Sequence, residues 1–206
     1  MDKNLIKQEA KAALVGKRLM LLVVILVASA ISGGLTLIGI GIILTPLLVM
    51  GLFLVTKDVL RNKEIDVNRF VEPFKDLNHA LKVIVVFILS ALLVSVGLLL
   101  LIVPGVILAL MYGQAVFIVA ENKDIDILDA FKKSKELMAG KKMDLFVLLL
   151  SFIGHYLLGI ITFGIYFLYF VPYLQTVLVN YYLHLTNQRS NTRTNEEVKE
   201  AEYQEK

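Results

Sequence analysis

The hydrophobic positions of this chain fall into three long runs without a charged residue. The runs cover residues 19–56, 83–120 and 145–188, which are 38, 38 and 44 residues long. One helix needs about 20 residues to cross the hydrocarbon core of a bilayer, so each run is long enough for two crossings. Backbone in lipid has to be helical or paired with itself, and each run is therefore predicted to form a helical hairpin. The predicted spans are 19–32, 36–56, 82–102, 105–120, 145–161 and 165–186.

Glycine and proline indicate the turns between the paired spans. A Gly-Gly step, a Val-Pro-Gly step and a Thr-Phe-Gly step stand at residues 33–34, 103–105 and 162–164. The predicted fold class is therefore all-α: a polytopic membrane protein with six transmembrane helices in three hairpins, forming one domain over residues 1–188. Residues 189–206 contain five glutamates and almost no apolar residue, so they are predicted to be a disordered tail.

Lysine and arginine occur only between the runs and at the two chain ends. The segment before residue 19 holds five of them, residues 57–82 six, residues 121–144 six and the segment after residue 188 four, which together are all 21 in the chain. Positively charged loops of membrane proteins face the cytoplasm. The distribution therefore predicts that both termini and both long loops are cytoplasmic.

The cytoplasmic segments are predicted to contain amphipathic helices. Apolar residues recur at helical spacing in residues 65–82 and 126–140, and more weakly in residues 5–15. Basic amphipathic helices beside spans usually lie in the headgroup layer, where each Lys or Arg gains about 1 kcal/mol near anionic lipid. The same faces are candidate docking surfaces for a protein or peptide partner, and both interpretations stay open. The large apolar residues on these candidate faces are Phe70, Phe74, Phe131 and Met138.

Two of these segments begin alike, which indicates an internal repeat. Residues 64–67 (Glu-Ile-Asp-Val) resemble residues 124–127 (Asp-Ile-Asp-Ile), and each lies about 20 residues after a proline, Pro46 or Pro104. Pro172 occupies the matching place in the third run. Repeats in the same direction suggest quasi-symmetric packing around an axis along the membrane normal, as in some transporters.

Composition narrows the possible chemistry. The chain is 57% hydrophobic and 19% charged, with a mean hydropathy of +0.74. That excludes a disordered chain and a water-soluble domain. The absence of cysteine excludes disulfides, thiolate metal sites and cysteine nucleophiles. No phosphate-binding loop, zinc-protease motif or nucleophile elbow occurs, and a net charge of +3 with interleaved acids does not indicate a nucleic-acid partner.

The paired acids of the repeat allow two interpretations. Asp124 and Asp126 form an Asp-x-Asp pattern of a kind that can bind metal ions. Asp126, three residues before Asp129, also fits a helix N-cap followed by an acid in the first turn, where the helix dipole stabilises it. We expect the capping role, and no cofactor or metal.

Most of the chain resembles a known family, and the resemblance is densest between Pro104 and Leu183. The matching patterns are Pro-Gly at 104–105, Ser-Lys-Glu-Leu-Met-Ala-Gly-Lys-Lys at 134–142, Leu-Ser-Phe-Ile-Gly at 150–154, Pro-Tyr at 172–173 and Tyr-Tyr-Leu at 181–183. With these residues the chain resembles the family catalogued as domain of unknown function 975, multi-pass membrane proteins mainly of Gram-positive bacteria. The resemblance implies a helical fold in a bacterial plasma membrane and supplies no activity. His155 stands where the family usually has tryptophan.

Polar residues inside the runs are the remaining candidates for function. The runs hold no Asp, Glu, Lys or Arg, which disfavours proton-coupled transport through a buried carboxylate. The uncharged candidates either form interhelical hydrogen bonds, worth roughly 0.6 kcal/mol each, or line a substrate pathway. Pro172 is predicted to kink the last span, which either shapes packing or hinges a gate. The candidate intramembrane polar residues are Gln114, His155, Gln175 and Asn180.

The sequence favours a non-enzymatic membrane protein that acts by binding, as an accessory, immunity or stress protein. The alternative is a small transporter or exporter of lipid-like or peptide substrates, which the repeat and the glycine- and proline-broken helices would suit. A third alternative is a membrane enzyme that uses His79 with the cytoplasmic Asp124 and Asp126. The expected partners are membrane lipids and, as an open alternative, a protein or peptide; the oligomeric state is left open.

Overall fold

The computed structural model describes residues 2–37, 41–61 and 63–204, without the side chains of residues 35–37, 42 and 187–204. This part of the chain is helical and contains no strand. The elements are α1 (Lys3–Ala13), α2 (Arg18–Leu37), α3 (Gly41–Leu60), α4 (Val67–Val71), the 3-10 helix η1 (Glu72–Phe74), α5 (Leu77–Leu100), α6 (Ile102–Tyr112), α7 (Ala115–Glu121), α8 (Ile127–Leu137), α9 (Lys142–Leu150), α10 (Ile153–Ile161) and α11 (Ile165–Gln204).

Each uncharged run folds as more than one helix. The first run forms α2 and α3, the second α5 with α6 and α7, and the third α9 and α10 with α11. Two of the predicted spans are interrupted: 105–120 breaks at Gly113-Gln114 and 145–161 breaks at Ser151-Phe152. The side chains of the predicted tail, residues 189–206, lie outside the described part of the chain. The disorder of this tail stays a prediction.

Two of the three predicted turns are misplaced. Gly33 and Gly34 lie inside α2, because a helix tolerates glycine at about 1 kcal/mol each and the apolar run continues past them. The connection to α3 at residues 38–40 lies outside the described residues. The second turn is at Leu101, whose backbone is extended, and Pro104 falls in the first turn of α6, where its missing amide hydrogen costs nothing.

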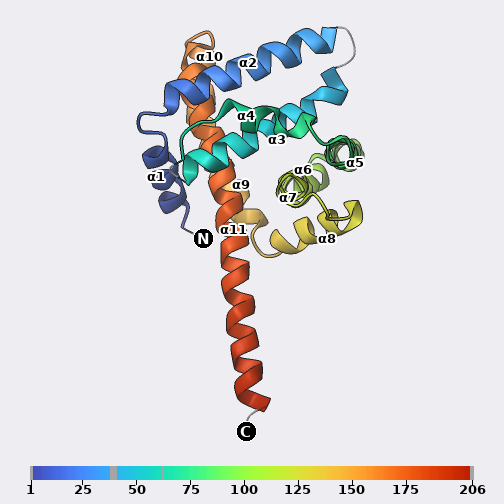
Figure 1. Ribbon diagram of the computed structural model, residues 1–206. Coiled ribbons are helices and arrows are strands. Elements are labelled where there is room, and N and C mark those ends of the chain that lie inside the picture. The colour runs from blue at the N-terminus through green and yellow to red at the C-terminus, as the bar shows by residue number, and fades with distance from the viewer. Residues whose placement is uncertain (1, 38–40, 62, 205–206) are drawn as a thin grey trace.

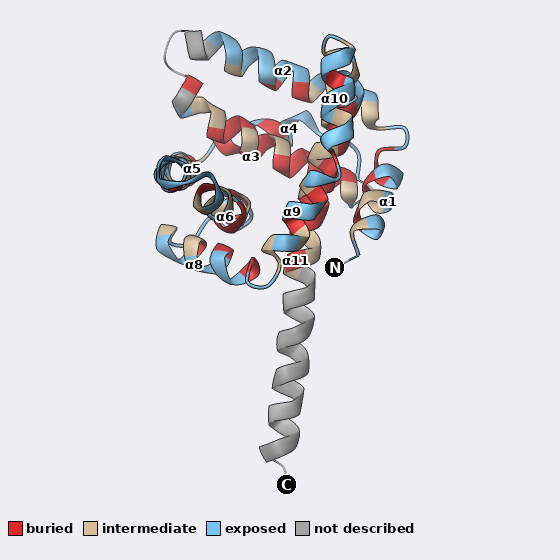
Figure 2. Ribbon diagram, turned by 180° about the vertical axis from the view of Figure 1, so that it is seen from behind, coloured by how far each residue is buried: buried red, intermediate tan, exposed pale blue. Residues whose placement is uncertain are grey.

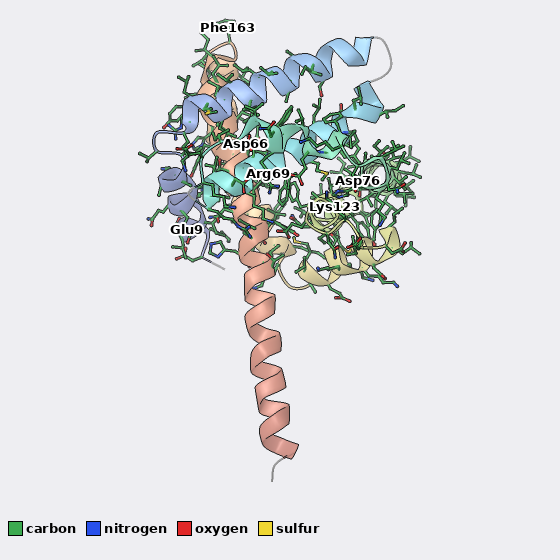
Figure 3. All side chains as sticks on the ribbon, viewed as in Figure 1. Glu9, Asp66, Arg69, Asp76, Lys123 and Phe163 are labelled. Carbon is green, nitrogen blue, oxygen red and sulfur yellow. The ribbon has the colours of Figure 1, made fainter. Side chains whose placement is uncertain are left out.

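The third turn lies where the sequence predicts it, at residues 162–164. Phe163 and Gly164 have φ angles of 50° and 89°, in the left-handed region that reverses the chain. Phe163 is almost fully exposed at the tip of the molecule (Figure 3). An aromatic side chain at an exposed hairpin tip is typical of a residue that sits at a membrane interface.

The three hairpins point in different directions. In Figure 1, α11 runs down the page, α2 and α3 lie across it, and α5, α6 and α7 are seen end-on. Among the described residues, four helical segments are long and apolar enough to cross a membrane, or five if α1 and α2, bent by 93°, count as one span. The predicted arrangement of six spans is therefore not confirmed.

One contact shows why six straight spans do not fit. The Arg18 guanidinium lies 4.1 Å from the centre of the Tyr169 ring. Arg18 is predicted at the cytoplasmic end of the first span, whereas Tyr169 is predicted near the outer end of the last one. If both spans were straight, the hydrocarbon core, about 30 Å thick, would lie between Arg18 and Tyr169, and the two residues could not touch. The first and third hairpins therefore cannot both run straight across the bilayer.

The core lies between the hairpins, with α3 and α11 at its centre. Figure 2 shows α3 and the side-chain-described part of α11 largely buried and α5 largely exposed. Phe53 of α3 stacks on Phe117 of α7, and both rings meet Tyr182 of α11 edge-on. These three rings join one helix from each hairpin.

The acidic linkers of the predicted repeat cap helices, as expected. Asp66 accepts a hydrogen bond from the Asn68 amide at the start of α4, and Asp126 accepts one from the Leu128 amide at the start of α8. Asp129 lies in the first turn of α8. The matched caps agree with the repeat at these two sites, while its quasi-symmetric packing stays a prediction.

Candidate functional site

The break between α6 and α7 is the centre of the candidate site. Helix α6 ends at Tyr112 and α7 begins at Ala115, which leaves Gly113 and Gln114 between them. The carbonyl of Met111 accepts a 2.8 Å hydrogen bond from the Ser134 hydroxyl of α8. Ser134 is fully buried, so the amphipathic helix α8 is fixed to the interrupted helix by an internal hydrogen bond.

An apolar pocket of about 520 Å³ lies on one side of this break. We call it the Gln114 pocket. Its walls come from α6, α7, α9, α10 and α11, and Gln114 is its one strongly polar side chain. Only 6% of Gln114 is exposed, and its side-chain oxygen Oε1 has no hydrogen-bond partner among the described residues. Apolar side chains on the walls include Val106, Phe117, Phe146, Leu149, Ile153 and Leu178.

A second apolar pocket, of about 450 Å³, lies on the opposite side of the same helix, against α3 and α5. Ala109, Gly113 and Phe117 line both pockets. The second pocket also has a buried polar atom, the Ser90 hydroxyl, without a partner among the described residues. We call it the Ser90 pocket. The broken helix thus separates two apolar pockets. Each is lined by one residue with a buried polar atom that has no partner among the described residues, Gln114 or Ser90.

The break between α9 and α10 is built differently. The Ser151 hydroxyl donates a 2.5 Å hydrogen bond to the Leu148 carbonyl and accepts one of 2.7 Å from the Lys7 ammonium of α1. Lys7 also lies 4.5 Å from the centre of the Phe152 ring, which is fully buried. Burial and the nearby charge of Lys11 lower the pKa of Lys7. This break is filled by side chains of the protein itself.

His155 belongs to the aromatic cluster beside that break. Its ring stacks on Phe170 with 5.0 Å between centroids and meets Phe152 edge-on at 5.6 Å. The imidazole of His155 therefore belongs to a packed group of aromatic rings.

Asn180 joins the N-terminal helix to α11. Its side-chain amide donates to the Ile6 carbonyl at 3.1 Å and to the Glu9 carboxylate at 2.8 Å. His184, one turn further along α11, binds the same Glu9 oxygen at 2.5 Å. Burial opposes the charge of Glu9, but the hydrogen bonds from Asn180 and His184 and the charge of His184 outweigh it, so the pKa of Glu9 lies below its usual value. Asn180 therefore makes the interhelical bond expected of it, with a helix the sequence places outside the spans.

Charged residues at the ends of the runs link the hairpins. Lys57 of α3 pairs with Glu121 of α7, and the Tyr182 hydroxyl donates a 2.7 Å hydrogen bond to the same carboxylate. The buried Asp58 forms an ion pair with Arg69, with 2.9 Å between the charged atoms. Arg69 is labelled in Figure 3. Sequence reasoning missed these contacts. Their only signal was that Lys57 and Glu121 are the first charges after an uncharged run.

The candidate docking faces are largely used within the chain. Phe70 and Met138 are buried, and Phe131 lies edge-on against Tyr112 with 5.4 Å between centroids. Phe74 is 45% exposed, so it is the member of this group most available to a partner. Phe70 approaches α3 at Gly51, where a Cβ atom would stand 2.4 Å from the Phe70 carbonyl oxygen.

The remaining predicted residues lie in α11. Pro172 is inside this helix, and the Thr176 hydroxyl donates a 2.7 Å hydrogen bond to the Pro172 carbonyl. Gln175 is half-buried and lies outside the Gln114 pocket. The structure therefore does not bring Gln175 together with Gln114 in one pathway.

The acids and histidines are the side chains that could form a metal site. No group of three or more His, Asp or Glu side chains among the described residues is arranged to hold a metal ion. His79 is buried and its Nε2 lies 2.7 Å from the Val119 carbonyl, while Asp126 caps α8.

Comparison with known proteins finds one family model that matches part of this chain. Residues 92–189 match the family model described as "Protein of unknown function (DUF975)". The resemblance to this family is confirmed. The match to DUF975 runs from the middle of α5 into α11, so it includes both helix breaks, α8 and the stacked His155. No curated protein and no solved structure matches the chain.

Proposed function

We propose that this protein is a non-enzymatic membrane protein that binds a lipid-like ligand in the Gln114 pocket. The observation that carries the proposal is the buried Gln114 side chain: this residue lines an apolar pocket, and its side-chain oxygen has no hydrogen-bond partner among the described residues. Accessory, immunity or stress roles in a bacterial plasma membrane would each build on this binding step.

The ligand's chemistry follows from the pocket walls. A buried acceptor without a partner costs about 1–3 kcal/mol, and a ligand with a hydroxyl or amide hydrogen removes that cost. The other walls are mostly aliphatic or aromatic and offer dispersion contacts to a hydrocarbon chain. The volume of about 520 Å³ suits a small ligand rather than a protein segment. An apolar chain that carries one hydrogen-bond donor fits both features.

The absence of catalysis is part of the proposal. A carboxamide neither takes up nor releases a proton near neutral pH, so Gln114 alone cannot act as a general acid or base. Binding with release of an unchanged ligand is the activity that this side chain supports.

Photolabelling of the purified, full-length protein tests the proposal. A long-chain alcohol with a diazirine in its chain is added in mild detergent, and labelled peptides are located by mass spectrometry. We expect labelling on α6, α9 and α10, reduced about fivefold in Gln114→Leu, the loss equivalent to a hydrogen bond of about 1 kcal/mol. Gln175→Leu is the matched control and should label like the wild type. Equal labelling of Gln114→Leu and wild type would overturn the proposal.

A second candidate function, a small transporter of lipid-like substrates, is favoured by the Ser90 pocket. It shares Ala109, Gly113 and Phe117 with the Gln114 pocket, so a ligand has a short route past the broken helix. Transfer of a fluorescent lipid between leaflets of proteoliposomes would support this function if Ala109→Phe, which narrows both pockets, abolished it. Transfer no faster than in protein-free vesicles would leave binding alone.

A further inference from the structure

A third pocket, distinct from the two at the helix break, lies at the junction of α1, α3 and α11. We call it the N-terminal pocket. It has a volume of about 480 Å³, and its polar walls are Glu9, Arg61, Asn180 and His184. Alanine and leucine side chains form the rest of its lining. It has no lining residue in common with either of the other pockets.

The N-terminal pocket presents charges of both signs. Glu9 extends from α1 (Figure 3), and its Oε2 atom is held by Asn180 and His184. Arg61 follows the end of α3 and is exposed, and its guanidinium has no ion pair with the described residues. A ligand of purely negative charge would approach Arg61 but meet the Glu9 carboxylate. A purely positive ligand would approach Glu9 but meet Arg61.

The predicted position of the pocket relative to the membrane indicates where such a ligand comes from. Arg61 belongs to a loop predicted to be cytoplasmic from its Lys and Arg content, and α1 precedes the first uncharged run. The walls combine charged groups with small apolar ones, which is the mixture found where a lipid headgroup joins its glycerol backbone. An ion pair with Arg is strongest when the partner offers several acceptor oxygens, as a phosphate does.

We propose that the N-terminal pocket binds a headgroup that carries a phosphate next to a primary ammonium, as in phosphatidylethanolamine. The phosphate pairs with Arg61, and the ammonium donates hydrogen bonds to the Glu9 carboxylate. A quaternary ammonium, as in phosphatidylcholine, has no N–H to donate to Glu9. Phosphatidylglycerol supplies the phosphate without the cation and leaves Glu9 facing a negative charge. The site should therefore select the ethanolamine headgroup over both.

Native mass spectrometry of the full-length protein with short-chain lipids tests this selectivity. Dihexanoyl lipids with ethanolamine, choline or glycerol headgroups compete for the protein in detergent. We expect the ethanolamine lipid to bind about tenfold more tightly than the other two, the effect of a charge-assisted hydrogen bond of about 1.5 kcal/mol. Free phosphoethanolamine in a parallel arm separates the sources: displacement of the lipid at similar concentration assigns the site to the free compound, and no displacement assigns it to the membrane lipid.

Two variants make the assignment specific. Arg61→Gln should weaken the ethanolamine lipid about tenfold, whereas Lys63→Gln, which removes a nearby exposed cation outside the pocket, should not. Glu9→Gln keeps an oxygen that can accept from Asn180 and should reverse the order, so that the glycerol headgroup binds best. Equal binding of the three lipids, or equal effects of Arg61→Gln and Lys63→Gln, would overturn the proposal. Labelling of the Gln114 pocket should be unchanged in Arg61→Gln and Glu9→Gln. The test of the N-terminal pocket is therefore independent of the proposed function.

Discussion

The molecule contains two apolar helical segments that are interrupted near their middle, and they differ in what occupies the interruption. At Ser151-Phe152, the hydroxyl and the aromatic ring are both engaged by Lys7, a residue 144 positions away in the sequence. At Gly113-Gln114, the backbone is stabilised by Ser134, but the Gln114 oxygen has no partner among the described residues and a pocket lies beside it.

The difference teaches that a polar residue in an apolar helix does not by itself reveal its role. Both breaks place one polar side chain in the middle of a hydrophobic segment. At the first, the polar side chain is the exposed Ser151, and a distant helix supplies its partner, Lys7. At the second, the cost of burying the Gln114 oxygen without a partner remains. Under the proposed function, a bound ligand would remove this cost. Proteins often keep such unfavourable groups where they act.

The largest expected effect is on the filled break. Phe152 is fully buried and contacts Phe170, Tyr173, His155 and Lys7. Replacing it by alanine leaves a cavity among these groups, and Phe152→Ala should lower the free energy of unfolding by about 3 kcal/mol. Thermal unfolding in detergent, followed by circular dichroism, measures the loss.

A matched variant on the wall of the Gln114 pocket sharpens this result. Phe146 is 36% exposed and lines the Gln114 pocket, so Phe146→Ala removes few internal contacts and should cost less than about 1 kcal/mol. If the two alanine variants were equally destabilised, the two breaks would not differ in packing, and the comparison would fail.

The second prediction is a gain of stability. Gln114→Leu keeps the side-chain volume while removing the unpaired buried oxygen, and it should stabilise the ligand-free protein by about 1 kcal/mol. Ser151→Ala should do the opposite, because it leaves the Lys7 ammonium without its acceptor. The two variants are compared in the same thermal assay after lipid has been removed. A Gln114→Leu variant that unfolds more easily than Ser151→Ala would mean that Gln114 has a structural partner.

The sequence was sufficient for the parts of this picture that depend on local pattern. The uncharged runs predicted apolar helical segments, and Asp126 predicted the cap of α8. Both features depend on residues within a few positions of one another. The resemblance to DUF975 was confirmed for the same reason, since its motifs are short and local.

What sequence reasoning missed depends on contacts between distant segments. Asn180 was predicted as an intramembrane polar contact, and its partners, Ile6 and Glu9, lie 174 and 171 residues away. Gln114 and Gln175 looked equivalent in the sequence, and only the packing of α6 and α7 against α9–α11 separates them. The directions of the hairpins could not be predicted either, because charge patterning fixes which end of a helix faces water and not its tilt.

The third prediction concerns the hydrogen bond that fixes α8 to the open break. Ser134→Ala leaves the Met111 carbonyl without its side-chain donor and should cost about 1 kcal/mol. Ser90 provides the matched control, because its hydroxyl has no partner among the described residues and Ser90→Ala should cost nothing. Thermal unfolding distinguishes the two. Equal losses would show that buried hydroxyls near this helix are interchangeable, against the geometry described above.

The smallest effect is a pH dependence of the filled break, which α1 reaches through Lys7 and holds through Glu9. The pKa of Glu9 lies below its usual value of about 4.3, so its contribution is complete above that pH and is lost as the pH falls through the lower, folded-state value. Glu9 is 41% exposed, and solvent screening keeps the effect small.

Because the chain has no tryptophan, Leu5→Trp, at an exposed position of α1, gives a single fluorescent reporter. Its emission should change only below about pH 4. Adding Glu9→Gln should remove the transition, and a reporter at Ile107 on α6 should show none; a transition shared by both reporters would indicate global acid unfolding instead.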